Sequence, residues 1–168
     1  CPDWPGCYGF VIFPMSEAEI AQANELYPER QFELEKAVPE VVHRYFAGFL
    51  GLLIIGLFGL SLYLKPFNSL VTKLTGALVL LVLAQSTFGY LTVSLKLWPQ
   101  VVTMHLLGGF ATTTLLFLTY MKLKDLDTGS SNSLMISKRS SNLLNFAFPV
   151  LIAQIILGVW LSSNYAAF

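Results

Sequence analysis

Residues 39–64, PEVVHRYFAGFLGLLIIGLFGLSLYL, decide the fold of this chain, because a short polar start leads directly into a long apolar run. No charged residue occurs between Tyr45 and Leu64. About 20 apolar residues are needed for a helix to cross the hydrocarbon core of a bilayer. The stretch therefore predicts a membrane-spanning helix whose polar residues, including His43, lie where it enters the membrane.

Three further segments have the same character, at residues 74–93, 101–121 and 143–161. The 168-residue chain is 55% hydrophobic and 12% charged, with a mean hydropathy of +0.64. A soluble domain carries about 25% charged residues. We therefore expect an all-α integral membrane protein, a transmembrane helix bundle with four spans. The net charge of zero gives no indication of a nucleic-acid partner.

Basic residues predict how the bundle is oriented, because they concentrate on the cytoplasmic side of membrane proteins. They flank the connections after the first and third spans: Lys65, Lys73, Lys122, Lys124, Lys138 and Arg139. The first 42 residues instead carry eight of the ten acidic residues. We therefore expect this N-terminal loop to face the periplasm or the exterior.

The only two cysteines lie in that loop, in CPDWPGCYGF at residues 1–10. A disulfide between Cys1 and Cys7 would persist on an oxidising side of the membrane. The prolines and Gly6 between them permit the tight reversal that so short a ring requires. A thiol or metal pair is the alternative, but no other Cys or His lies close by in the sequence. We favour the disulfide.

Residues 16–28, SEAEIAQANELYP, predict a short surface helix. Ser16 and Glu19 have the spacing of a capping box, and Pro28 marks the end. One face carries Ile20, Ala23 and Tyr27. This helix is either a lid that rests on the membrane surface or bundle, or a gate over a ligand site.

The two histidines of the chain are expected at the same membrane depth. His43 begins the first span, and His105 lies just over one turn into the third, which runs in the same direction. Ionisable side chains at such depth are costly and usually face the bundle interior. The small residues that follow them leave room for a flat group: Ala47, Gly51, Gly108, Gly109 and Thr112. Paired axial histidines are an established haem arrangement.

A structural explanation of these residues stays open. Small residues in membrane helices often serve close helix packing, and a lone histidine is often hydrogen-bonded to a neighbour. Two histidines at matching depth on parallel helices favour cofactor binding over that explanation.

Two charged residues flank His43. Glu40 shares its helical face at i, i+3 spacing, and Pro39 predicts that the helix begins there. Glu40 is then either a first-turn carboxylate favoured by the helix dipole, or a proton acceptor or substrate-orienting group. Arg44 either pairs with a carboxylate of a bound ligand or extends to the membrane interface.

Four stretches together resemble the haem A synthase family in its proteobacterial form: CPDWPGCYG, EVVHRYFAGFLGLL, FGYLTVSLKLWPQVVTMHLLGG and QIILGVWLSSNYAAF. The resemblance implies an eight-helix protein of two similar four-helix halves, each with a histidine pair. It implies an oxidoreductase that converts the methyl group of haem O to a formyl group, giving haem A for the terminal oxidase.

Carried onto this chain, the resemblance assigns the substrate haem to His43 and His105 as iron ligands. It assigns catalysis to Glu40 and matches Cys1 and Cys7 to an outer cysteine pair. A haem b would belong to the second half. Implied partners are haem O, membrane lipid, haem O synthase and an electron-transfer partner, and a homo-oligomer is compatible with the sequence. The alternatives are a b-type haem electron-transfer cytochrome and a non-catalytic membrane subunit.

The resemblance also implies an organisation, in which the chain is a fragment covering helices two to five. Residues 1–42 are expected to form the periplasmic loop with the Cys pair and the short helix. Residues 43–121 would be three helices of the first half, 122–142 a cytoplasmic loop, and 143–168 the first helix of the second half.

Overall fold

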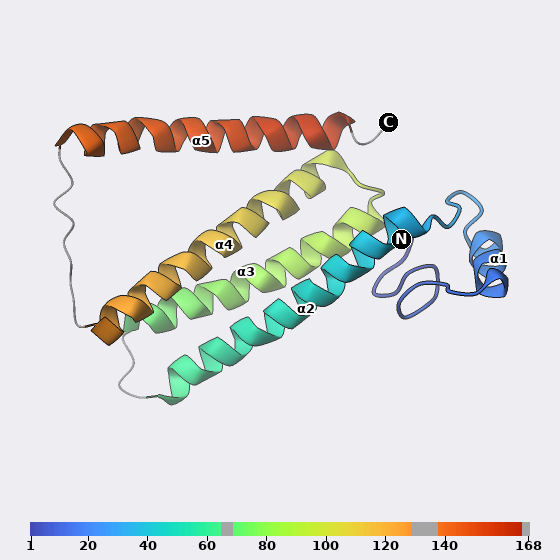
Figure 1. The fold of residues 1–168 in the computed structure, drawn as a ribbon, viewed down its shortest axis with the longest axis horizontal. Helices are drawn as coiled ribbons and strands as arrows, with labels where there is room; N and C mark the ends of the chain where they lie inside the picture. Colours follow the sequence, from blue (N-terminus) through green and yellow to red (C-terminus); the bar gives the residue numbers. More distant parts are fainter. Residues whose placement is uncertain (65–68, 129–137, 166–168) are drawn as a thin grey trace.

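The computed structural model describes residues 1–64, 69–128 and 138–165. In these ranges the chain forms five helices and no strand. They are α1 (Glu17–Leu26), α2 (Leu34–Tyr63), α3 (Ser69–Ser94), α4 (Pro99–Thr128) and α5 (Lys138–Tyr165). Helices α2 to α5 are each long and apolar enough to cross a membrane. The predicted all-α fold with four spans is confirmed (Figure 1).

Helix α3 lies between α2 and α4 and packs against both, while α5 packs against α4 (Figure 1). Within the described residues, the backbones of α2 and α4 make no contact with each other. Any contact between these two helices must therefore come from side chains that reach across the space beside α3.

The outward faces of the long helices are apolar. Phe46 and Leu52 of α2 are 71% and 70% exposed, and Leu80 of α3 is 71% exposed. Monomeric soluble proteins rarely expose large contiguous apolar patches. A lipid surrounding removes this cost. Polar groups inside the layer find partners, as where Ser61 Oγ and Thr75 Oγ1 meet at 3.1 Å between α2 and α3.

The long helices extend beyond the apolar runs that predicted them, as expected where a span has polar ends. Lys65, one of the basic residues on which the orientation prediction depends, lies outside the described residues. The centre of the predicted cytoplasmic loop, residues 129–137, also lies outside them.

The start of the first span differs from the prediction. Helix α2 begins at Leu34, where the N–H groups of Lys36 and Ala37 donate to the carbonyl of Glu33, so Pro39 is inside the helix rather than at its first position. A proline there removes one backbone hydrogen bond. The burial of Ala37 against the N-terminal loop offsets this loss. The helix dipole stabilises carboxylates most in the first turn of a helix. Glu40 lies beyond that turn of α2.

Helix α1 forms with the predicted capping box. The Ser16 hydroxyl accepts a hydrogen bond from the Glu19 N–H, and the Glu19 carboxylate accepts from the N–H groups of Met15 and Ser16. These donors hold the pKa of Glu19 below its usual range. The helix ends at Leu26, before Pro28.

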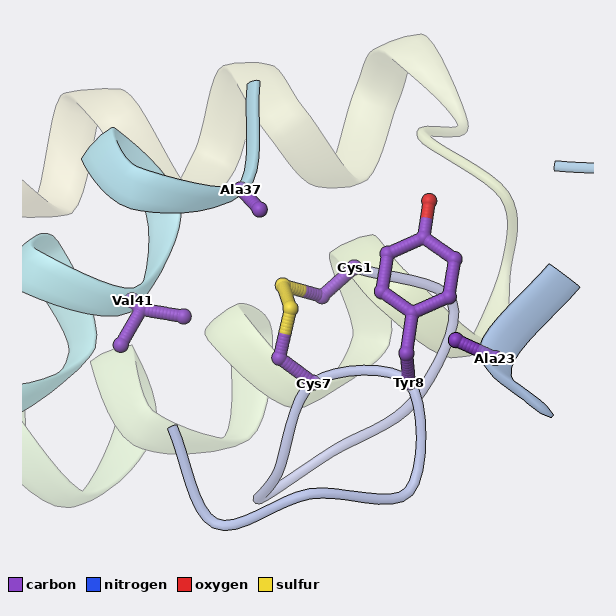
Figure 2. Packing of buried hydrophobic residues seen from close by; sticks show 6 residues of the cluster. All are labelled: Cys1, Cys7, Tyr8, Ala23, Ala37 and Val41. Atoms are coloured by element: carbon purple, nitrogen blue, oxygen red, sulfur yellow. A yellow bond between two sulfur atoms is a disulfide. The ribbon is translucent and has the colours of Figure 1, made fainter. Parts of the chain in front are cut away.

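A buried cluster joins the N-terminal loop to both neighbouring helices (Figure 2). A disulfide links Cys1 and Cys7, and α2 covers it through Ala37 and Val41. Two further residues complete the cluster: Tyr8 of the N-terminal loop and Ala23 of α1. The predicted lid helix thus rests on the cysteine loop, which in turn rests on α2.

The ring closed by the disulfide is held in one conformation by its own polar groups. The Asp3 carboxylate accepts hydrogen bonds from the N–H groups of Tyr8 and Gly9, two residues with positive φ angles of 58° and 82°. The Tyr8 hydroxyl donates to the carbonyl of Gln31 at 3.0 Å. Burial raises the pKa of Tyr8, which keeps this donor protonated.

We expect Gly6→Ala to disturb this ring. A Cβ at Gly6 would lie 2.4 Å from the backbone oxygen of Phe10, and that oxygen is already bonded to the Cys7 N–H at 2.8 Å. The backbone must therefore shift, at a cost of about 1–3 kcal/mol. Reduction of the disulfide by a phosphine, followed by thiol labelling, should be faster than in the unsubstituted protein. Gly48→Ala is the control, because nothing lies within 4 Å of its Cβ position. Equal rates in all three proteins would contradict the expectation.

Candidate functional site

The two histidines meet across the space between α2 and α4. The ring centroids of His43 and His105 are 6.2 Å apart, and the ring planes are nearly perpendicular at 89°. Since the two helix backbones are not in contact, these side chains connect them. His43 is exposed on the open side of the layer, and His105 is half-buried.

His105 carries an unsatisfied nitrogen. Its Nδ1 atom is buried and has no hydrogen-bond partner among the described residues. Leaving a buried polar group unpaired costs about 1–3 kcal/mol, so such an atom calls for an explanation. A histidine that merely stabilises the helix packing would have its nitrogens paired, which is not the case for this atom.

The histidine pair fits a group that takes one imidazole on each of two faces. Haem iron is such a group. The described residues contain no cluster of three or more His, Cys, Asp or Glu side chains that could hold a bare metal ion. The donor set of His43 and His105 therefore suits a porphyrin-bound metal, whose other ligands come from the macrocycle.

The small residues beside the histidines do not all leave open space, contrary to the prediction. A Cβ at Gly51 would lie 3.3 Å from Val82 of α3. A Cβ at Gly108 would lie 1.6 Å from Nε2 of Gln85, also on α3. Both glycines allow α3 to pack closely. Gly109, by contrast, has nothing within 4 Å of its Cβ position.

The sequence-based prediction did not single out Gln85 or Gly89, which α3 places next to the candidate site. The Gln85 amide occupies the space above Gly108, one turn from His105 on α4. A Cβ at Gly89 would lie 3.4 Å from Cε1 of His105. The available signal was the only amide side chain among residues 74–93, since such polar side chains are rare inside a span.

Glu40 and Arg44 form an ion pair one turn outward from His43. Nη2 of Arg44 donates to Oε1 of Glu40. The Arg44 side chain is 16% exposed and the Glu40 side chain 35%. The carboxylate of Glu40 is thus held by a group of the protein itself.

The other end of the Arg44 guanidinium contacts the cysteine ring. Its Nη1 donates to the carbonyl oxygens of Asp3 at 3.0 Å, of Gly6, and of Pro5 at 3.4 Å. The guanidinium is directed to groups of the protein itself. This arrangement favours neither of the two interpretations that the sequence offered for Arg44.

A pocket of about 270 Å³ opens beside this ion pair. Its lining includes Cys1, Tyr8, Arg30, Glu40 and, from the α3–α4 turn, Leu97. Ligand pockets typically have about 300–1,000 Å³, so this pocket is small for a porphyrin. The open face at His43 is the better place for a large flat ligand, with Glu40 between that face and the pocket.

Comparisons with known proteins identify the family of the chain. Residues 1–168 match the family model COX15-CtaA, described as cytochrome oxidase assembly protein. A curated heme A synthase of Shewanella oneidensis is 42% identical over 167 residues, which are 99% of this chain and 49% of that protein. The chain thus spans about half the length of the curated relative that it matches. No solved structure matches. Since the family model covers all 168 residues, the chain belongs to the COX15-CtaA family of cytochrome oxidase assembly proteins.

Proposed function

We propose that this chain is part of a haem A synthase, which oxidises a methyl group of haem O to a formyl group and provides haem A for the terminal oxidase. The observation that carries the proposal is the pair of imidazoles from α2 and α4, 6.2 Å apart, with an unpaired buried nitrogen on His105. The name of the 42% identical relative supports the same activity.

In this proposal His43 and His105 hold the substrate haem from its two faces. The iron of the bound haem supplies the oxidative chemistry, and the protein supplies binding and orientation. His43 is exposed on the face between α2 and α4, so a porphyrin can reach its imidazole from the side. His105 is half-buried on α4, with α3 next to it at Gly89.

Glu40 is proposed as the proton acceptor. With water as the source of the formyl oxygen, oxidation of the methyl group releases protons together with electrons, and a positioned carboxylate can accept the protons. Glu40 lies on the same face of α2 as His43, at i, i+3 spacing, and therefore next to the edge of a ligand held there. The contact with Arg44 orients the carboxylate.

The surroundings of the site are part of the proposal. We place the cysteine ring on the periplasmic side of the bacterial inner membrane, in agreement with the basic residues at the opposite ends of the spans. Haem O synthase would supply the substrate, and an electron-transfer partner would take the electrons. A haem b would belong to a second histidine pair outside this chain.

The test is to express the full-length protein in membranes that contain a source of haem O, and then to extract the haems with acid and separate them. Haem A in the extract would support the proposal. Recovery of unmodified haem alone would indicate an electron-transfer cytochrome instead. The absence of any Soret absorbance in the purified protein would indicate a non-catalytic subunit and would overturn the assignment of His43 and His105.

A further inference from the structure

Arg44 connects two parts of the outer site that are distant in sequence. Its guanidinium donates to three carbonyls of residues 3, 5 and 6, all inside the ring that the Cys1–Cys7 disulfide closes. The same guanidinium donates to Glu40, one turn earlier on α2. A planar guanidinium with five fixed donors suits such multiple contacts, whereas a lysine ammonium does not.

The ring also lies next to Glu40, because Cys1 and Glu40 line the same pocket. One oxygen of the carboxylate is held to the ring through Arg44. Other charged residues line the same pocket as Glu40: Arg30, Glu33 and Lys36. Nζ of Lys36 lies 2.8 Å from Oε2 of Glu33, so these two pair with each other. The ring and Arg44 supply the contacts that set the place of the carboxylate.

The disulfide itself is poorly placed to react with a partner protein. Cys7 is fully buried and Cys1 is 8% exposed, beneath Ala37 and Val41 of α2 (Figure 2). Its buried position suits a structural disulfide that holds the ring closed. Closing the ring keeps the carbonyls of Asp3 and Gly6 turned toward Arg44.

We propose that Arg44 is a positioning residue: it fastens Glu40 to the Cys1–Cys7 ring, so that the closed ring determines where the carboxylate stands next to His43. This inference rests on the proposed role of Glu40. It differs from binding of a ligand carboxylate, since the donors of Arg44 are directed to groups of the protein.

The first test measures the ring without any haem chemistry. In the purified full-length protein, the disulfide is reduced with a phosphine, and the freed thiols are labelled with a maleimide over time. Arg44→Gln should speed reduction by about tenfold, as expected when charge-assisted hydrogen bonds to the ring are lost. Arg44→Lys should give an intermediate rate, and Arg30→Gln, which removes an exposed charge from the same pocket, should change little. Equal rates for the Gln and unsubstituted proteins would overturn the proposal.

The second test is a double-mutant cycle between Arg44 and Glu40, with the rate of haem A formation as the readout. If Arg44 acts through Glu40, Arg44→Gln should slow conversion strongly in the unsubstituted protein and add little in a Glu40→Gln background. A merely structural role would give two losses that multiply, and that result would overturn the proposal. Lys at position 44 should restore part of the rate.

The two tests separate this inference from the proposed function. Faster reduction in Arg44→Gln, in a protein that forms no haem A, would retain the link between Arg44 and the ring and refute the synthase. The converse result is also possible: the protein forms haem A, Arg44→Gln does not change the rate of disulfide reduction, and the losses of the Arg44 and Glu40 variants multiply. That result would retain the synthase and refute the role of Arg44.

Discussion

Replacing His105 by alanine is expected to abolish haem A formation. Removal of an axial imidazole should lower haem affinity and conversion by at least about 100-fold, because even indirect partners of metal ligands typically contribute 10–100-fold. His43→Ala should give the same loss, since in the proposed site the two rings, whose centroids are 6.2 Å apart, hold the same haem. The measurement is acid extraction of haems from membranes, with Soret absorbance of the purified variants.

A second measurement separates a haem ligand from a structural histidine. Since the ring of His105 lies beside Gly89 and next to His43, its removal should lower the thermal stability of the haem-free protein only modestly, while haem binding is lost. Leu106→Ala, at the adjacent position on α4, which is 44% exposed, is the matched control and should keep haem. Destabilisation of the haem-free His105→Ala protein, with normal haem A yield, would assign the histidine to packing.

The spans could be predicted from the sequence because the length of an apolar run is set by the bilayer and needs no tertiary information. The meeting of His43 and His105 could be predicted for a similar reason, since the rise of a helix fixes depth once the direction of each span is known. These two predictions depend only on local geometry.

The predictions that failed depended on long-range packing. The start of α2 before Pro39 is stabilised by Ala37 packing against a disulfide far away in the sequence. The space at Gly108 is filled by Gln85 of another helix. The sequence also did not indicate the contacts of Arg44, because they are made by carbonyl groups of a ring whose conformation no periodicity describes.

Glu40→Gln is expected to slow haem A formation by about 100-fold or more while haem stays bound. Positioned general bases typically contribute 10²–10⁴-fold, and glutamine keeps the size of the side chain but cannot accept a proton. Soret absorbance should match that of the unsubstituted protein. Glu35→Gln is the control, because it removes the same charge from an exposed position in the first turn of α2. Unchanged haem A formation in Glu40→Gln would contradict the assigned role.

Glu40→Asp distinguishes the chemistry of the carboxylate from its position. Aspartate can accept a proton, but its side chain is one methylene shorter, so its carboxylate cannot reach Arg44 from the same place. If catalysis needs a carboxylate only somewhere near His43, Glu40→Asp should restore most of the rate lost in Glu40→Gln. If it needs the carboxylate where the ring places it, the aspartate variant should stay much nearer to the glutamine variant. We expect the second result, because a displacement of about 1 Å can cost about 100-fold in a positioned catalytic group.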